Sequence, residues 1–347
     1  MGESFESRTS KVEGRNEPSA IAAGSRPSTL DPRSGPGWRA WRRFRSNRPA
    51  FFSGWYLGGL VFLILFWPLV LSLASGLGPR SAALAAVYAP DRLSDAQFAP
   101  PGLRHWFGTD EHGRDLFSRV LYGAQISLLV GVVGACVSLV IGVLWGAVAG
   151  YRGGRVDSLM MRTVDVLYSL PSIIFVIVLL TTLGGWLKQW GFVQQSPALA
   201  KGLHVMLLLV GLGAVSWLTM ARIVRGQVLS LRTRPFVEAS RALGAGPWWI
   251  LRRHILPNVF GVAIVYLTLT VPAIVLYESF LSFLGLGIQP PMASWGSLLA
   301  EGVAQINPIR IYWWLVACPA GVLVSTLLAL NFVGDGLRDA WEVKGQT

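Results

Sequence analysis

Six long apolar stretches, separated by polar segments, dominate the hydrophobic pattern of this chain of 347 residues. Each stretch approaches the roughly 20 residues that an α-helix needs to cross the hydrocarbon core of a bilayer. The pattern predicts membrane spans at about residues 51–74, 126–150, 164–183, 205–223, 261–284 and 311–334. Gly, Ser and Pro inside several spans allow helices to approach closely or to bend. We therefore expect an all-α integral membrane protein with six packed transmembrane helices.

The segments between the spans predict the remaining organisation. Residues 1–50 are rich in Ser, Arg, Gly and Pro, and this composition predicts a disordered basic tail. Residues 75–125 form a long loop whose last part begins an amphipathic pattern over 116–128, and we expect that helix to lie along the outer membrane surface. Residues 126–336 form the core with five spans and a polar loop at 226–258, and residues 337–347 form a short tail.

Basic residues beside the spans predict the orientation in the membrane. Arginines cluster before the first span, between the second and third spans, and between the fourth and fifth spans. Because cytoplasmic loops carry an excess of basic residues, both termini and the 226–258 loop are expected in the cytoplasm. The loop at 75–125 contains five arginines and five acidic residues. This balanced loop is expected outside, because long loops weigh less in the rule.

Composition agrees with this reading, since 52% of the residues are hydrophobic and only 14% are charged. The net charge of +12 could suit nucleic acid, but the arginines lie in loops beside apolar stretches, so we expect no nucleic-acid partner. Cys136 and Cys318 lie inside apolar stretches, where a thiol usually acts as a small hydrophobic group. The chain contains no phosphate-binding loop and no convincing catalytic constellation, so we expect no enzymatic activity, no metal and no directly bound cofactor.

The loop between the fourth and fifth spans has the pattern of two short helices. Pro235 suits the first turn of a helix and Gly244 suits its end. Pro247 suits the start of a second helix, which we expect to end at Pro257. Glu238 is spaced to form ion pairs on the first helix, with Arg234 and Arg241.

Two interpretations of this loop remain open from its residues. A basic loop can simply touch lipid headgroups. Alternatively, it can form a docking surface, in which small residues admit a partner and Trp248 or Trp249 anchors it.

The loop also resembles the EAA loop of ATP-binding-cassette importer permeases. That pattern is EAA, three residues, G, nine residues, I, any residue, LP, and this chain departs from it at Ser240 and His254. In the family the loop forms coupling helices that sit in a cleft of the ATPase subunit. The resemblance therefore implies a coupling role for Glu238, Ala239, Ser240, Leu243, Gly244, Pro247, Leu256 and Pro257.

A second segment, HWFGTDEHGRDLFSRVLYGAQISL at residues 105–128, is similar to the GTD-x-x-GRD-x-x-x-SR signature of C-type permease subunits. These subunits belong to dipeptide, oligopeptide and nickel importers. Gln125 stands where the signature has Arg, and residues 278–302 and 331–342 also resemble the oligopeptide branch. The resemblance marks an extracytoplasmic motif at Gly108, Thr109, Asp110, Gly113, Arg114 and Asp115.

Acidic residues in two places suggest further chemistry. Asp110, Glu111, His112 and Asp115 are metal-ligating residue types, but their spacing matches no closed coordination pattern. We favour a glycine turn that Asp110 and Asp115 cap. Glu278 lies near the outer end of the fifth span. It is either a pathway residue or a hydrogen-bond acceptor inside the bundle.

The resemblance implies the type I importer permease fold and a set of partners. These are a homologous second permease, two ATPase subunits that carry ATP and Mg²⁺, an extracytoplasmic solute-binding protein and the lipid of the bacterial cytoplasmic membrane. The implied function is import of peptides by alternating access. A nickel chelate, an opine or another small solute is the alternative cargo, and an ATP-independent channel or secondary transporter is the alternative class.

Overall fold

The computed structural model describes residues 36–189, 197–290 and 292–341, and every regular element in these ranges is a helix. Five helical segments are long and apolar enough to cross a membrane. They are α2 (Arg48–Gly76), α4 (Leu116–Arg152), α8 (Pro197–Leu231), the helix that ends as α11 (Leu256–Phe283), and α13 (Trp314–Trp341). The shorter elements α1 (Pro36–Ser46), α3 (Pro79–Val87) and α12 (Trp295–Ala304) lie at the ends of these spans.

The third predicted span is broken into two helices. α5 (Gly154–Tyr168) and α6 (Ser172–Lys188) meet at an angle of 86°. The break contains Pro171, which lacks a backbone N–H and disfavours helical geometry in the residue before it. Counted as one bent span, the pair brings the total to six, as the hydrophobic pattern predicts.

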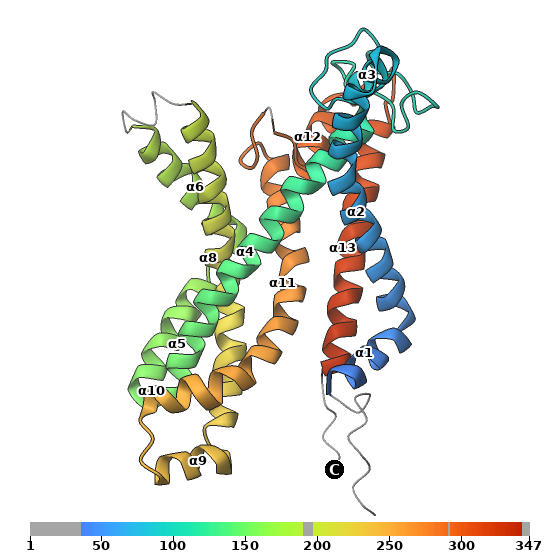
Figure 1. The fold of residues 1–347 in the computed structure, drawn as a ribbon. Helices are drawn as coiled ribbons and strands as arrows, with labels where there is room; N and C mark the ends of the chain where they lie inside the picture. The colour runs from blue at the N-terminus through green and yellow to red at the C-terminus, as the bar shows by residue number, and fades with distance from the viewer. Residues whose placement is uncertain (1–35, 190–196, 291, 342–347) are drawn as a thin grey trace, which may run out of the picture.

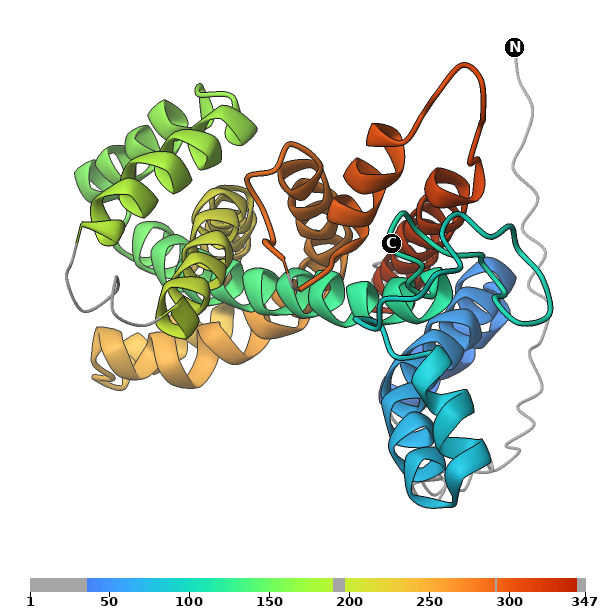
Figure 2. The same cartoon turned by 90° about the horizontal axis from the view of Figure 1, so that it is seen from above.

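Helix α4 is the centre of the arrangement. It runs obliquely through the molecule, with α5, α6 and α8 towards one end and α2, α12 and α13 towards the other (Figure 1). The view from above shows the same order, with α4 crossing between the two groups (Figure 2). Helix α11 packs on both α4 and α13 and so connects the two groups.

A stripe of small residues lets α8 lie against α4. Gly134, Ser138, Gly142, Gly146 and Gly150 are spaced by four residues and therefore share one face of α4. A Cβ atom on Gly146 would lie 2.9 Å from both the Arg225 backbone nitrogen and the Val224 Cβ. The close approach of the two backbones therefore requires glycine there, as in other membrane helix pairs.

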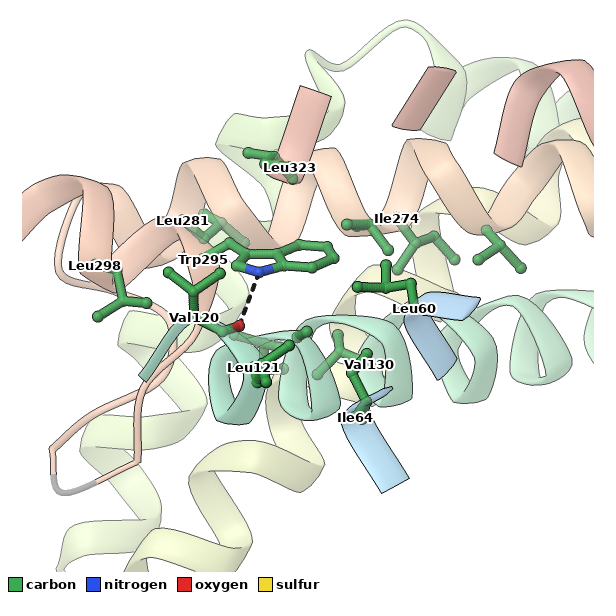
Figure 3. Packing of buried hydrophobic residues seen from close by; sticks show 14 of the residues in the cluster. Leu60, Ile64, Val120, Leu121, Val130, Ile274, Leu281, Trp295, Leu298 and Leu323 are labelled. Atoms are coloured by element: carbon green, nitrogen blue, oxygen red, sulfur yellow. Dashed lines mark hydrogen bonds between the residues drawn. The ribbon is translucent and has the colours of Figure 1, made fainter. Parts of the chain in front are cut away.

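Trp295, at the start of α12, fills the core between α4 and α11. Its side chain is fully buried, and its indole Nε1 donates a hydrogen bond to the Val120 carbonyl oxygen at 3.2 Å. Figure 3 shows the ring packed among Val120, Leu121 and Leu281. This contact fixes the loop after α11 to the first turns of α4.

Two predictions about this end and the N-terminus are wrong. Residues 116–128 do not form a separate surface helix, because they are the first turns of α4 and most of them are buried under α12 and the preceding loop. Residues 36–46 of the expected disordered tail form α1, which packs on α13 through Phe44. The other predicted tail segments, residues 1–35 and 342–347, lie outside the described residues.

Candidate functional site

The loop between α8 and α11 forms a hairpin that projects beyond the ends of the spans (Figure 1). Its first arm is α9 (Pro235–Ala242), and its second arm begins as α10 (Pro247–Ile250). Gly244 follows α9 with a φ of 84°, a left-handed conformation that glycine adopts without steric cost. The expected helix start, stop and restart at Pro235, Gly244 and Pro247 are therefore confirmed.

The expected end of the second arm at Pro257 is wrong. Helix α10 continues through a π-helical turn at Leu251–Ile255 directly into α11, so arm and span are one continuous rod. Pro257 lies in the first turn after the π turn, where the hydrogen-bond register changes and its missing N–H is tolerated. A force on this arm is therefore applied directly to the membrane span.

An apolar inner face holds the hairpin to the bundle. Val237, Ile250 and Ile255 are 0%, 1% and 0% exposed, and they pack with Val228 of α8 and Val259 of α11. Burying side chains of this size stabilises the contact by roughly 1.5–3 kcal/mol each. The hairpin is thus a packed extension of the bundle.

The outer face of the hairpin has large exposed apolar side chains. Phe236, Leu243, Trp248 and Trp249 are 41%, 88%, 67% and 52% exposed. Ala239 and Glu238 are exposed beside them. Exposed aromatic and aliphatic side chains around small residues are typical of a protein-docking surface.

Glu238 does not form the expected pairs with Arg234 and Arg241. The ion pairs that the described residues form in this half of the molecule are Arg222–Asp165 and Arg225–Asp157. Arg241 instead lies over the Tyr151 ring, at 5.8 Å from its centroid. Exposed pairs on a short helix contribute only a few tenths of a kcal/mol, so competing contacts replace them easily.

The two positions that depart from the EAA pattern contact each other across the hairpin. Ser240 Oγ donates to the Phe236 carbonyl oxygen at 2.8 Å and lies 3.2 Å from His254 Nε2. Because the hydroxyl proton is directed to Phe236, the pair is best satisfied when Nε2–H of His254 donates to Ser240. The His254 ring also packs edge-on against Trp249, at a centroid distance of 5.0 Å.

Ion pairs connect α8, at the base of the hairpin, with α5, the first helix of the broken span. Arg225 donates from Nε and Nη2 to the two carboxylate oxygens of Asp157, at 2.5 and 2.7 Å. Arg222 donates to Asp165 at 2.8 Å and lies over the Tyr168 ring at 4.2 Å. These two pairs therefore link α8 to α5.

The motif at residues 108–119 forms an ion network at the opposite end of the molecule. Asp110 accepts hydrogen bonds from the backbone nitrogens of His112 and Arg114, at 2.8 and 2.9 Å. Its other carboxylate oxygen accepts from the side chains of Arg114 and Arg119, at 2.6 and 2.8 Å. Arg119 also donates to both carboxylate oxygens of Glu301 on α12, at 2.5 and 3.0 Å. The motif thereby fastens the loop and α4 to α12.

The rest of the motif shapes the turn before α4. Asp115 caps this helix by accepting from the Ser118 backbone nitrogen at 2.9 Å, and it accepts from His105 Nδ1 at 2.9 Å. Gly108 and Gly113 have φ angles of 77° and 70°. Thr109 Oγ1 accepts from the Ala99 backbone nitrogen at 2.8 Å. The expected turn, capped by Asp110 and Asp115, is confirmed.

No group of three or more His, Cys, Asp or Glu residues is placed to hold a metal ion in the described ranges. Asp110 is instead paired with arginines and backbone nitrogens, and Asp115 with His105 and the Ser118 backbone nitrogen. Sequence reasoning missed Glu301 because it lies 182 residues from Arg119. The only available signal was its place inside the segment 278–302 that resembles the oligopeptide branch.

Glu278 is fully buried and accepts hydrogen bonds from serine hydroxyls. Ser127 Oγ and Ser282 Oγ lie 2.9 and 2.7 Å from its carboxylate oxygens. Ser127 Oγ in turn accepts from the Trp295 backbone nitrogen at 3.2 Å. This geometry matches the expected acceptor inside the bundle, joining α4, α11 and α12. Gln125, nearby on α4, donates to the Ile64 carbonyl oxygen of α2 at 3.0 Å.

Two family models match most of the chain. Residues 142–343 match the family described as binding-protein-dependent transport system inner membrane component. Residues 35–101 match the N-terminal TM domain of oligopeptide transport permease C.

Named relatives cover most of the chain. The dipeptide transport system permease protein DppC of Bacillus subtilis is 43% identical over 305 residues, which are 88% of this chain and 85% of the relative. The oligopeptide transport system permease protein OppC of the same species is 39% identical, over 94% of this chain and 96% of the relative. OppC of Haemophilus influenzae is 47% identical, over 69% of this chain and 70% of the relative.

Among solved structures, an inward-facing form of the MetNI methionine ABC transporter aligns with a TM-score of 0.48 and 21% identity. The alignment covers 65% of this chain and 97% of that chain.

Proposed function

Because this chain belongs to the binding-protein-dependent transport system inner membrane components, we propose that it forms part of the peptide pathway of an ATP-driven importer. It is a multi-pass membrane protein of the ABC importer permeases. Peptides are the favoured cargo, over a nickel chelate or an opine, because the named relatives are dipeptide and oligopeptide permeases.

The observation that carries the proposal is the hairpin, with a packed inner face and an exposed apolar outer face. Its outer face, around Glu238, Ala239 and Leu243, is the proposed docking surface for an ATPase subunit. The second arm is continuous with α11, and a short turn at residues 232–234 joins the first arm to α8. A displacement of the hairpin therefore moves two spans together, and the Arg225–Asp157 pair extends the motion to α5.

The proposed mechanism is alternating access. ATP binding draws two ATPase subunits together, and each carries the coupling hairpin docked on it. The rods attached to the hairpins then turn, so that the passage closes on the ATPase side and opens on the opposite side. Hydrolysis and release reverse the movement. This chain supplies the levers and the passage, and ATP and Mg²⁺ are held by the partner subunits.

The proposed assembly contains a homologous second permease, two ATPase subunits and an extracytoplasmic solute-binding protein, in the bacterial cytoplasmic membrane. The hairpin and α1 lie at one end of the molecule, and the loop with the ion network lies at the other (Figure 1). The basic residues of the first end support a cytoplasmic location for the hairpin and both termini.

The test is reconstitution of the chain with its partner permease, the ATPases and the binding protein in proteoliposomes. We expect ATP-dependent peptide uptake and ATPase stimulation by the loaded binding protein. Reversing the charge of the exposed Glu238 (Glu238→Arg) and adding a side chain to Gly244 (Gly244→Leu) should uncouple hydrolysis from uptake.

The same substitution at Gly154, outside the hairpin, is a matched control for Gly244→Leu. Both glycines have a positive φ, 56° and 84°, and an added Cβ at either one meets nothing within 4 Å. Gly154→Leu therefore introduces the same backbone strain outside the hairpin. The coupling role would be refuted if both hairpin variants kept normal coupling of hydrolysis to uptake, or if Gly154→Leu lost as much coupling as they do. Uptake without ATP would support a channel or secondary transporter instead.

A further inference from the structure

Helix α1 has an exposed face that neither the bundle nor the coupling hairpin uses. Trp38, Trp41, Arg42 and Arg45 occupy positions i, i+3, i+4 and i+7 and therefore share one side of this helix. The two Trp side chains are 49% and 51% exposed, and both Arg side chains are exposed. We call these four residues the α1 face.

The opposite side of α1 holds the helix in place. Phe44 is 9% exposed and packs with Ala50 of α2 and Ala340 of α13. A Cβ on Gly336 would lie 3.2 Å from the Phe44 ring, so glycine there gives the ring room. The α1 face is thus presented in a fixed position at the end of α2 and α13 (Figure 1).

The sequence around the α1 face has basic residues but no acidic ones, and the apolar span α2 follows it. Between Asp31 and Asp91 the sequence contains no acidic residue. Asp335 and Asp339 on the neighbouring α13 are exposed, and the described residues show no ion pair between them and Arg42 or Arg45. Arg45 also lies over the Phe51 ring, at 5.6 Å from its centroid.

The aromatic surface continues from α1 into the membrane span. Phe52 and Trp55, in the first turns of α2, are 69% and 70% exposed, and the apolar span follows them without interruption. The α1 face therefore lies at the level where a bilayer changes from hydrocarbon to headgroups. Trp side chains are enriched at that level, and Arg side chains there reach lipid phosphates.

We propose that the α1 face is a binding surface for anionic phospholipid headgroups, with Arg42 and Arg45 contacting phosphate and Trp38 and Trp41 inserting beside it. The continuous aromatic surface favours a membrane over an acidic soluble protein, because a soluble partner would not reach the lipid-level side chains of α2. The surface would hold α1, and with it the α2–α13 pair, at a constant depth during transport.

The test is a titration of the purified full-length chain in detergent with phosphatidylglycerol and, separately, with zwitterionic phosphatidylethanolamine, read by native mass spectrometry. Each Arg near an anionic lipid surface contributes about fivefold to binding, so R42Q/R45Q should weaken phosphatidylglycerol binding roughly 25-fold. Phosphatidylethanolamine binding should change little. R42K/R45K should keep the preference, and W38A/W41A should weaken both lipids.

R92Q/R104Q is the matched control, because it removes two exposed arginines from the loop at the other end of the molecule. The proposal is overturned if R42Q/R45Q binds phosphatidylglycerol as the unmodified chain does, or if R92Q/R104Q weakens binding equally. An effect of R42Q/R45Q that is seen only with ATPase subunits present would also overturn it and would indicate a protein contact. The lipid titration involves no transport, so its outcome is independent of the proposed function.

Discussion

Ser240 and His254 form a polar contact between the two arms of the hairpin. Their polar atoms lie 3.2 Å apart, and the two residues belong to different arms. A family pattern with Ala and Ile at these positions would join the arms by apolar contact instead. A hydrogen bond has a stricter direction than an apolar contact, so this pair adds a directional constraint to the apolar packing of the hairpin's inner face.

We predict that Ser240→Ala and His254→Ala each reduce ATP-coupled uptake about fivefold, because one hydrogen bond contributes about 1 kcal/mol. The double variant S240A/H254I replaces the polar pair by an apolar one and should recover most of the uptake. Proteoliposome uptake divided by ATPase rate is the measurement.

Thr233→Ala is the control, since the Thr233 hydroxyl is exposed and donates to the Ser230 carbonyl oxygen in its own turn, at 3.2 Å. The pair does not position the arms if both single variants keep the full ratio of uptake to ATPase rate. The same conclusion follows if the double variant has a ratio as low as that of the more impaired single variant.

At the scale of helices, two kinds of contact hold α8 in place. The glycine stripe of α4 brings the two backbones together, and ion pairs join α8 to α5. The stripe acts through shape and the ion pairs act through charge. They therefore respond differently to substitution.

Gly146→Ala should lower the thermal stability of the purified protein. The added Cβ would lie 2.9 Å from the Arg225 backbone nitrogen of α8 and closer still to the Ala221 carbonyl oxygen, so the helices must separate, and overpacking of this kind costs about 1–3 kcal/mol. Gly226→Ala, on α8 itself, meets nothing within 4 Å and should be neutral or stabilising by up to about 1 kcal/mol. Equal melting temperatures for the two variants would contradict the close packing of α4 on α8.

The two ion pairs should differ in strength. Asp157 is 11% exposed at its side chain and receives two hydrogen bonds, so Asp157→Asn should destabilise the protein by about 1–3 kcal/mol. Asp165 is 65% exposed at its side chain, and Asp165→Asn should cost no more than about 1 kcal/mol. Thermal unfolding at low and high salt tests this, because only the exposed pair is strongly screened. A larger effect at Asp165 would reverse our ranking.

At the scale of the whole molecule, the hairpin tip and the loop before α4 lie at opposite ends (Figure 1). Leu243 is 88% exposed at the first place and Leu103 is 99% exposed at the second. The distribution of arginines supports the proposed cytoplasmic location of the hairpin end. These two positions therefore report the orientation of the entire chain.

In a background without Cys136 and Cys318, we expect a membrane-impermeant maleimide to label Leu103→Cys but not Leu243→Cys in cells with a permeable outer membrane. In inverted vesicles the pattern should reverse, and added ATPase subunits should protect Leu243→Cys. Labelling of Leu243→Cys in intact cells would invert the proposed topology.

The sequence by itself determined the features that depend on neighbouring residues. Long apolar stretches predict spans because backbone groups in lipid must be satisfied within their own helix. Pro235, Gly244 and Pro247 mark the hairpin, because each limits the backbone locally. These local features alone were enough to assign the chain to the all-α membrane proteins.

Only the tertiary structure decided which distant groups meet. The first turns of α4 are buried because α12 covers them, and Arg119 finds its partner Glu301 from 182 residues away. The amphipathic pattern of residues 116–128 could not distinguish burial under protein from contact with lipid headgroups. Likewise, Phe44 orders α1 through a contact with α13 at the other end of the chain. Periodicity states which face of a helix is apolar, but the packing of elements remote in sequence determines what that face touches.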